Sequence, residues 1–173
     1  MPLWPTLTTP RLTLRSPVAG DAAQIAALAN DFGIGRMTTL PFPYALTDAV
    51  EFLQRVEDRD PQRAALFALD HPEHGLIGMV GLDDRGGPAP ELGYWLGRPY
   101  WGKGLISEAT AAAVAWAYRD WGQRYLVSGH FIDNPTSGRV LIKTGFLYTG
   151  VVETRVCPAR GGEVDTRMMV WLG

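Results

Sequence analysis

Two glycines that flank a lysine, Gly102-Lys103-Gly104, stand directly before an alanine-rich segment and form a candidate anion site. Before them, Glu91 to Leu96 is short, aromatic and apolar, as strands are, and after them Leu105 to about Tyr118 has strong helix propensity. No Ser, Thr, Asp or Asn directly precedes Leu105, so the first N–H groups of the helix lack an internal partner. Free N–H groups at a positive dipole end, approached over glycines, suit a phosphate. The alternative is that Ser107 caps a slightly shorter helix and the glycines only make a turn.

This stretch resembles a known family signature. Gly93-Tyr94-Trp95-Leu96, then Tyr100-Trp101-Gly102-Lys103-Gly104 and Ser107-Glu108-Ala109, are similar to the acetyl-CoA pyrophosphate loop of the GNAT N-acetyltransferase superfamily, written Gln/Arg-x-x-Gly-x-Gly/Ala. The wording is most similar to the RimJ/RimL branch, which acetylates ribosomal-protein N-termini and many other amines. The first motif position falls on Pro99, with Arg98 one residue early, which affects a side-chain contact to phosphate but not the backbone cradle.

A second helix start carries polar side chains that fit the same family. Asn134 at the cap and Pro135 at the first helical position predict a short helix that stops at Gly145. Asn134-x-x-Ser137, followed by Val140 to Phe146, resembles the second GNAT signature, which implies that the Asn134 amide helps to hold the pantetheine arm and that Ser137 lies near the sulfur. The alternative is that Asn134 is only the helix cap and Ser137 only a polar residue of the helix.

The resemblance implies acetyl-CoA as co-substrate and no metal. The expected cofactor-binding residues are Trp95, Leu96, Gly97, Gly102, Lys103, Gly104, Leu105, Ile106, Ser107, Asn134 and Lys143. Many GNAT enzymes carry a tyrosine four residues before the Gly-Phe pair as the acid that protonates the leaving thiolate. That position is Leu141 here, so the usual acid is absent, and Ser137 or water is the nearest candidate to hydrogen-bond the thiolate.

Glu91, at the head of the central strand, is the candidate base. An amine must lose its proton before it attacks a thioester, and a lysine-like amine with a pKa near ~10.4 needs a base, or a water chain to one, more than an α-amine near ~8 does. Glu91 can equally be an exposed carboxylate at a strand start. The oxyanion is expected to meet a backbone N–H in the Trp95–Gly97 segment, where the resembled family opens its sheet. Glu91 and Ser137 are therefore the predicted catalytic residues.

Four other residues offer weaker chemistry. His71 and His74 stand in a turn without an evident third ligand, so we do not expect a metal site. His130 ends a strand near the site and is an alternative base. Cys157 lies in a Pro/Gly loop with no base in reach by sequence, so a covalent cysteine mechanism is not expected.

Composition and charge bound the class of protein. The 173 residues are 46% hydrophobic and 20% charged, which predicts one globular domain over residues 1–173. The formal net charge of -2 favours neither nucleic acid nor a membrane surface as a partner, and a single cysteine fits a reducing compartment. Met1 to Thr6 is not a signal peptide, and no apolar run reaches membrane-spanning length. We expect a soluble cytoplasmic protein, a monomer or a homodimer.

Periodicity predicts the elements that position these residues. The alternating segment Thr9 to Arg15 predicts a strand, and Asp21 to about Asn30 a helix with Ile25, Leu28 and Ala29 on one face. Thr47 is expected to cap the next helix, whose buried stripe would be Val50, Leu53 and Val56. Further predicted strands run from Ala64 to Leu69, Leu76 to Leu82, Tyr125 to Phe131, Phe146 to Val152 and Val164 to Trp171.

The predicted fold class is α+β, or three-layer α/β, with a mixed, mostly antiparallel sheet of about seven strands flanked by about four helices. The strands from Ala64 to Leu96, joined by turns at 70–75 and 83–88, indicate an antiparallel meander. The order of elements matches the GNAT layout. The leading interpretation is an acetyl-CoA-dependent N-acetyltransferase that acts on a primary amine, either a small molecule or a protein N-terminus, by direct attack. The alternatives are another acyl group or a hydroxyl acceptor, and a non-catalytic CoA-binding regulatory module. A nucleotide-binding protein is disfavoured because the glycines lack the Gly-x-x-x-x-Gly-Lys-Ser/Thr spacing.

Overall fold

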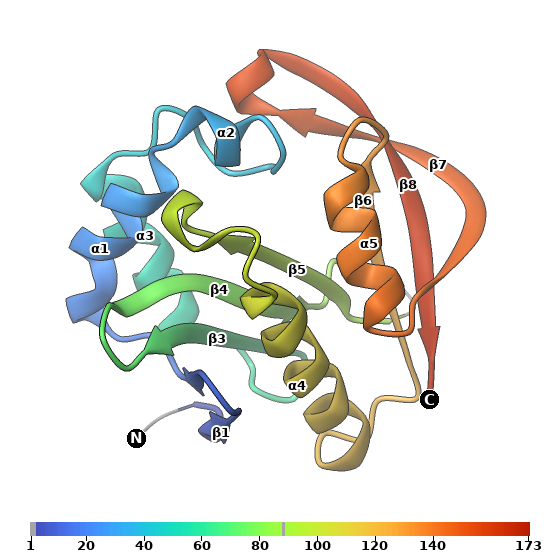
Figure 1. The fold of residues 1–173 in the computed structure, drawn as a ribbon, viewed down its shortest axis with the longest axis horizontal. Helices are drawn as coiled ribbons and strands as arrows, with labels where there is room; N and C mark the ends of the chain where they lie inside the picture. The colour runs from blue at the N-terminus through green and yellow to red at the C-terminus, as the bar shows by residue number, and fades with distance from the viewer. Residues whose placement is uncertain (1–2, 88) are drawn as a thin grey trace.

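A computed structural model describes residues 3–87 and 89–173 as one eight-stranded sheet with helices packed on it (Figure 1). Met1, Pro2 and Pro88, the last residue of the predicted turn at 83–88, lie outside the described residues. The strands are β1 (Leu7–Thr8), β2 (Thr13–Arg15), β3 (Ala64–His71), β4 (Gly75–Asp83), β5 (Glu91–Leu96), β6 (Tyr125–Phe131), β7 (Leu147–Cys157) and β8 (Gly162–Leu172). The α-helices are α1 (Ala22–Ala29), α2 (Phe32–Gly35), α3 (Leu46–Glu57), α4 (Leu105–Arg119) and α5 (Pro135–Lys143). The predicted mixed, three-layer α+β fold is confirmed, with the added strand β1 and helix α2.

The sheet opens between its fifth and sixth strands. The order is β1-β2-β3-β4-β5-β6-β8-β7, and β3, β4 and β5 form the predicted antiparallel meander. β5 and β6 are parallel neighbours and pair only at Glu91 and Val127, near the start of both strands. Beyond that pair the two strands diverge, as Figure 1 shows. The carboxyl half of β5 therefore faces a gap in the sheet.

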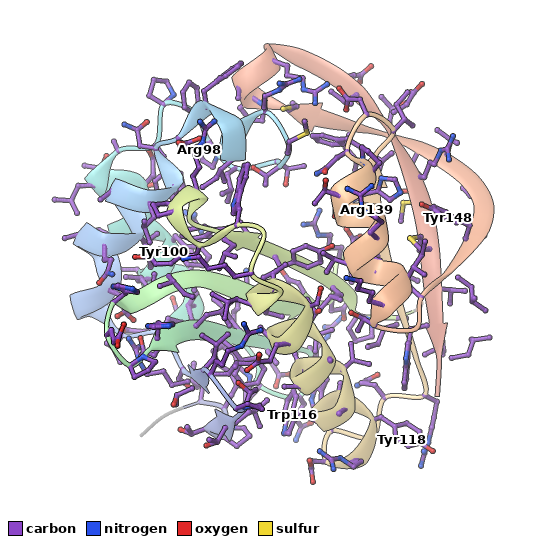
Figure 2. All side chains as sticks on the ribbon, viewed as in Figure 1. Arg98, Tyr100, Trp116, Tyr118, Arg139 and Tyr148 are labelled. Carbon is purple, nitrogen blue, oxygen red and sulfur yellow. The ribbon has the colours of Figure 1, made fainter. Side chains whose placement is uncertain are left out.

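Helices cover both faces of the meander because its strands are apolar on both sides. Leu66 and Phe67 are adjacent on β3 and must point to opposite faces. Phe67 packs edge-on against Trp116 of α4, with ring centroids 5.3 Å apart, and Figure 2 labels Trp116 on that helix. Leu66 faces the side that carries Ile25 of α1, because both line the same cavity. The sheet is thus held between α4 on one face and α1 on the other.

Two details of α3 differ from the prediction. The cap is Ala45 rather than Thr47, and the Asp48 carboxylate accepts the Ala45 N–H at 2.7 Å. The Asp48 side chain thus satisfies the N–H of the cap residue itself, and the Asp48 N–H, which a capping hydroxyl would accept, bonds the Ala45 carbonyl instead. The buried stripe consists of Ala49, Leu53 and Val56, whereas Val50 is exposed. Ala49, Leu53 and Val56 are four and three residues apart and therefore share one face of the helix. Val50 is the next residue after Ala49, about 100° further around the helix, and faces solvent.

Among the described residues, none of the helices combines the length and the apolar character needed to span a membrane.

Candidate active site

The helix after the glycine pair begins without a side-chain cap, as predicted. Gly102 and Gly104 both have φ +75°, which L-residues with a side chain rarely adopt. Gly104 is the cap residue of α4 and supplies no side chain, and the first backbone bond of the helix runs from the Glu108 N–H to the Gly104 carbonyl. The N–H groups of residues 105–107 therefore point out of the helix end without a helical partner. Ser107 does not cap a shorter helix, so that alternative is excluded.

Arg11 stands beside this helix end, which the sequence did not reveal. Its Nη1 donates to the Lys103 carbonyl at 2.8 Å, and its Nε donates to Glu108 at 2.7 Å. Burial raises the pKa of Glu108, but the hydrogen bonds from Thr9 and Arg11 outweigh it and the pKa is lowered. The guanidinium therefore fixes the glycine loop and neutralises a carboxylate that would repel an anion there.

Asn134 caps α5 as predicted and keeps its amide donor. Its Oδ1 accepts the Ser137 N–H at 3.2 Å, and among the described residues its Nδ2 has no hydrogen-bond partner. The capping role is thus established, and a role toward a ligand stays a prediction. Lys143 is exposed in the last turn of α5, two turns away from Asn134.

Two cavities adjoin one another at the open part of the sheet, because Tyr94, Trp95 and Ser137 line both. The central cavity, of about 290 Å³, has walls that include Leu66, Gly81, Glu91, Gly93, Tyr94, Ser137 and Arg155. The loop groove, of about 190 Å³, runs from the glycine pair to α5. Eight predicted residues line the groove: Trp95, Leu96, Gly102, Gly104, Leu105, Ile106, Asn134 and Ser137. Gly97, Lys103, Ser107 and Lys143 line neither cavity, although the first three are chain neighbours of groove residues.

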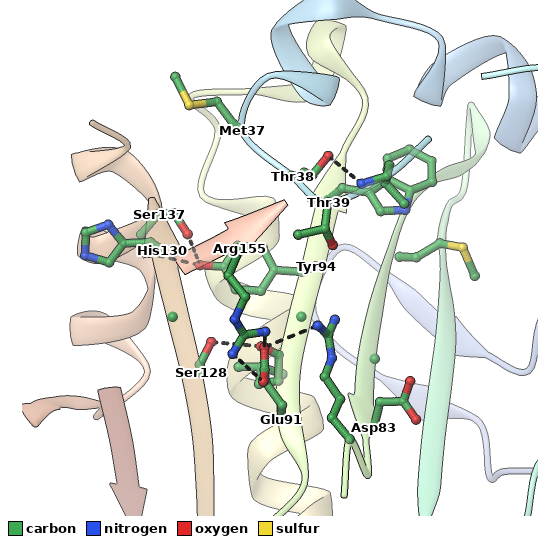
Figure 3. Close-up of a pocket in the computed structure, with 18 of the residues that line it drawn as sticks. Met37, Thr38, Thr39, Asp83, Glu91, Tyr94, Ser128, His130, Ser137 and Arg155 are labelled. Carbon is green, nitrogen blue, oxygen red and sulfur yellow. Dashed lines mark hydrogen bonds and ion pairs between the residues drawn. The ribbon is translucent and has the colours of Figure 1, made fainter. Parts of the chain in front are cut away.

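The two cavities meet at a pair of hydroxyl groups. Tyr94 and Ser137 line both of them, and the Tyr94 hydroxyl lies 2.8 Å from Ser137 Oγ and 3.1 Å from the Ser137 carbonyl oxygen (Figure 3). Burial raises the pKa of Tyr94 from 10.0 to about 12, although the hydrogen bond with Ser137 acts in the opposite direction. The phenol therefore keeps its proton at neutral pH. In the sequence, Tyr94 is recognisable only as part of the Gly93–Leu96 motif.

The end of the β4–β5 ladder leaves one backbone donor of β5 turned away from β4. The Gly97 N–H donates to the Ile77 carbonyl of β4 at 2.8 Å. In an antiparallel ladder every second residue bonds the same neighbour, so Trp95 faces β4 as Gly97 does. The N–H of Leu96 points to the opposite side, where β5 has left β6. Within the predicted Trp95–Gly97 segment, Leu96 is thus the residue whose N–H points toward the opening between β5 and β6.

Glu91 is held by an arginine rather than standing free at a strand start. Arg155 of β7 donates to both Glu91 carboxylate oxygens, at 3.0 and 3.1 Å, and Figure 3 shows the two side chains meeting in the central cavity. The Glu91 side chain is 15% exposed and that of Arg155 is 19% exposed. Burial lowers the pKa of Arg155, but its hydrogen bonds and charge interactions with Glu91 and Glu153 outweigh this and raise it. The pair is therefore a fixed, charged feature of the cavity wall.

The hollow of the central cavity comes from two glycines. Gly81 of β4 pairs with Gly93 of β5, and Leu66 of β3 lies opposite Gly81. A Cβ added at Gly93 would meet no atom within 4 Å. Two adjacent positions on this face of the sheet thus lack side chains, and the space they leave is the floor of the cavity.

The remaining candidates lie away from the junction or are otherwise engaged. His130 lines the central cavity, but its Nε2 lies 2.9 Å from the Tyr148 hydroxyl and its Nδ1 2.8 Å from the Phe131 carbonyl. Its ring points away from Glu91 in Figure 3. Cys157 is fully buried and lines neither cavity.

A small cluster at the β3–β4 turn has the residue types of a metal site. Candidate ligand atoms of His71, Glu73 and His74 lie within 4.8 Å of one another. Glu73 is thus the third ligand type that was not evident in the sequence. However, the His71 Nδ1 already accepts the Glu73 N–H at 3.2 Å, so a metal on that nitrogen would have to displace this hydrogen bond. The absence of a metal stays an expectation.

Comparison with known proteins shows which family and which relatives this chain is similar to. The acetyltransferase (GNAT) domain family matches residues 11–147. The uncharacterized N-acetyltransferase YoaA of Bacillus subtilis (strain 168) is 28% identical over 155 residues, covering 87% of each chain. The ribosomal-protein-serine acetyltransferase of Escherichia coli (strain K12) is 30% identical over 83 residues, covering 47% of this chain and 46% of that one. The crystal structure of Mycobacterium smegmatis RimJ in complex with CoA-disulfide has the same fold, with a TM-score of 0.84 and 19% identity over 99% of this chain and 90% of that one.

Proposed function

The chain belongs to the acetyltransferase (GNAT) domain family, and on that basis we propose that it transfers the acetyl group of acetyl-CoA to a primary amine within a ternary complex. The observation that carries the proposal is the meeting of two cavities at Tyr94 and Ser137. One cavity begins at an uncapped helix start and the other is a separate hollow in the sheet. A donor and an acceptor can therefore reach one point from opposite sides, which direct transfer requires.

The loop groove fits acetyl-CoA. Residues 105–107 offer outward N–H groups to the phosphates, and the glycines at 102 and 104 allow the close approach. The unpaired Asn134 amide lies farther along the groove, where it can donate to the pantetheine arm. The residues from Trp95 to Gly97 would border the thioester. Lys143 lies at the far end of α5, so its proposed role is a peripheral charge contact with the nucleotide end.

The central cavity is the proposed acceptor site. The amine nitrogen attacks the thioester carbon, the carbon–sulfur bond breaks, the amine loses a proton and the thiolate gains one. The Leu96 N–H is oriented to stabilise the oxygen that becomes negative during the attack. Glu91 remains the proposed base: Arg155 holds both of its oxygens, yet a carboxylate has about four lone-pair sites, so it can still take up the amine's proton through a chain of waters along the roughly 10 Å of strand from Tyr94 to Glu91.

The hydroxyl pair is proposed to serve the leaving thiolate. Ser137 lies at the cavity junction, and the buried Tyr94 phenol shares a hydrogen bond with it. A phenol with a pKa of about 12 is protonated at neutral pH, so Tyr94 keeps donating to Ser137 and leaves the Ser137 hydroxyl free to donate a hydrogen bond to the thiolate, which takes its proton from water. This pair replaces the tyrosine expected at the position of Leu141.

The wider setting follows from the same reasoning. We treat residues 1–173 as one acetyltransferase domain, because β8, which lies beyond the family match, pairs with β6 along seven residues. The relatives named above support a RimJ/RimL-like enzyme acting on a small-molecule amine or a protein N-terminus. We further propose that it acts in the cytoplasm as a monomer or a homodimer, without nucleic acid or membrane partners.

The test is release of free CoA from acetyl-CoA with a panel of primary amines and protein N-terminal peptides. Gly93→Val should fill the acceptor cavity, because its Cβ has open space and its φ is not in the left-handed region. We expect turnover to fall at least about tenfold, while acetyl-CoA still raises the melting temperature. Gly20→Val is the matched control, since a Cβ there also meets nothing. If no acceptor promotes CoA release while acetyl-CoA binds, the chain is a CoA-binding module; if Gly93→Val keeps full turnover, the acceptor site is elsewhere.

A further inference from the structure

The charged groups of the central cavity are unequally paired. Three arginines line it, Arg59, Arg85 and Arg155, against two carboxylates, Asp83 and Glu91. Each carboxylate already has a close guanidinium partner. Arg155 holds both oxygens of Glu91, and Arg59 contacts Asp83 at 3.0 Å. The acceptor therefore meets no carboxylate in this cavity that lacks a cation.

Arg85 is the arginine of this cavity whose N–H donors have no hydrogen-bond acceptor among the described residues. Within the described residues its contact is an ion pair with Glu91 at 3.9 Å, beyond hydrogen-bond distance, and its side chain is 49% exposed. The adjacent Asp84 cannot satisfy it, because that carboxylate accepts from Arg63 at 2.6 and 2.9 Å and from the Gly86 N–H at 2.8 Å. Glu153, the other acid near Arg155, does not line the cavity. A planar fork of N–H donors thus faces the cavity with little to bond.

On the basis of the proposed function, we propose that the amine acceptor also carries an anionic group, a carboxylate or a phosphate, which the Arg85 guanidinium binds. A guanidinium binds either group through two parallel hydrogen bonds, and both are stronger than neutral bonds because donor and acceptor are charged. The charges of the cavity disfavour a polyamine as acceptor. Its second ammonium group would meet guanidinium groups, and carboxylates that are already paired with arginines.

The chain dimensions place the anion at the far end of the acceptor. Tyr94 and Glu91 are three residues apart on β5, or roughly 10 Å along the strand. The amine would lie at the Tyr94–Ser137 junction and the anionic group near the Glu91 end, where Arg85 is. An amino acid with a long side chain, a short peptide or a phosphorylated amine has this separation of charges.

The experiment compares amines that differ only in the anionic group. The pairs are short peptides against their C-terminal amides, and 6-aminohexyl phosphate against 6-aminohexanol, with spermidine as the polyamine; kcat/KM for CoA release is measured for each. The parent should prefer the anionic member of at least one pair by about ten- to a hundredfold, as expected for hydrogen bonds to a charged group. Which pair shows the preference separates a carboxylate from a phosphate ligand.

Variants then test whether Arg85 is the receptor. Arg85→Gln should abolish the preference by slowing only the anionic substrates, and Arg85→Lys should retain part of it because the charge remains but the fork is lost. Arg139→Gln removes the same charge from an exposed position outside both cavities and should change nothing. Equal turnover of acids and amides, a preference for spermidine, or an undiminished preference in Arg85→Gln overturns the inference while leaving amine acetylation standing. If no amine of either kind is acetylated, the proposed function fails and the inference fails with it.

Discussion

Removing Arg155 should destabilise the protein more than its position on an edge strand suggests. In Arg155→Met, Glu91 keeps its charge in a largely buried position and loses both short contacts. Breaking a fully buried pair costs about 3–5 kcal/mol, whereas exposed pairs are worth about 0.2–1 kcal/mol. Because the two side chains are 15% and 19% exposed, we expect a loss of about 2–3 kcal/mol in the free energy of unfolding, below the fully buried limit.

The assay is urea unfolding followed by tryptophan fluorescence, together with the melting temperature. For a chain of this length, a loss of about 2–3 kcal/mol corresponds to a fall of roughly 5–10 °C. A second change, Glu91→Gln, in the Arg155→Met background should restore part of the loss, because it removes the unpaired charge. Arg63→Met is the matched control, since that arginine also makes two short bonds to a carboxylate, Asp84, but is 68% exposed.

Two results would refute this reasoning. If Arg155→Met unfolds at the same urea concentration as Arg63→Met, the Glu91–Arg155 pair behaves as a solvated surface pair. If the losses from Arg155→Met and Glu91→Gln simply add in the double variant, the two side chains are not coupled, and the cavity wall is held together by other contacts.

The pKa of Tyr94, about 12 when folded against 10.0 when unfolded, favours the neutral phenol in the folded protein, so its contribution is present below pH 10 and is lost as the pH rises toward 12. Relative to Tyr94→Phe, the parent should lose roughly 1 kcal/mol of unfolding free energy between pH 9 and 11, measured by urea unfolding; parallel curves would contradict the buried phenol. Gly104→Ala should cost about 1 kcal/mol from its left-handed φ and weaken acetyl-CoA binding at least tenfold by titration calorimetry, whereas Gly86→Ala, with φ +79° in an open loop, should cost similar stability and leave binding unchanged. Asn134→Asp keeps the capping oxygen and should match the parent in melting temperature but bind acetyl-CoA more weakly, and Asn134→Ala should lose about 1 kcal/mol as well; equal affinity in Asn134→Asp would leave the residue a cap alone.

The elements whose bounds could be predicted from the sequence are those that nearby residues determine. The bounds Glu91–Leu96 and Tyr125–Phe131 agree with β5 and β6 residue for residue, and α4 begins at Leu105 as expected. In each case a turn residue or a change in periodicity marks the boundary within a few positions. The uncapped start of α4 and the Asn134 cap could be predicted for the same reason, because a cap depends on residues within one turn.

The contents of the central cavity depend on partners far apart in the chain. Arg155 meets Glu91 across 64 positions, and Gly81 and Gly93 form one hollow only after β4 and β5 pair in register. A single sequence contains the two glycines but not the fact that they lie side by side. For the same reason the sequence did not reveal Arg11, which contacts the glycine loop from 92 positions earlier in the chain. A glycine inside each of two predicted neighbouring strands was the one available signal for a cavity.

The missing tyrosine at position 141 shows how a local pattern can be read too narrowly. Leu141 is fully buried in the hydrophobic core and lines neither cavity, so a hydroxyl at this position would lie in the core rather than at the junction. The phenol that does reach Ser137 comes from β5, 43 positions away in sequence and 2.8 Å away in space. Chemistry requires a protonated hydroxyl near the leaving sulfur, and it does not require that hydroxyl to come from a particular helix. Leu141 is therefore no argument against catalysis, because the divergence of β5 from β6 exposes Tyr94 to the same point.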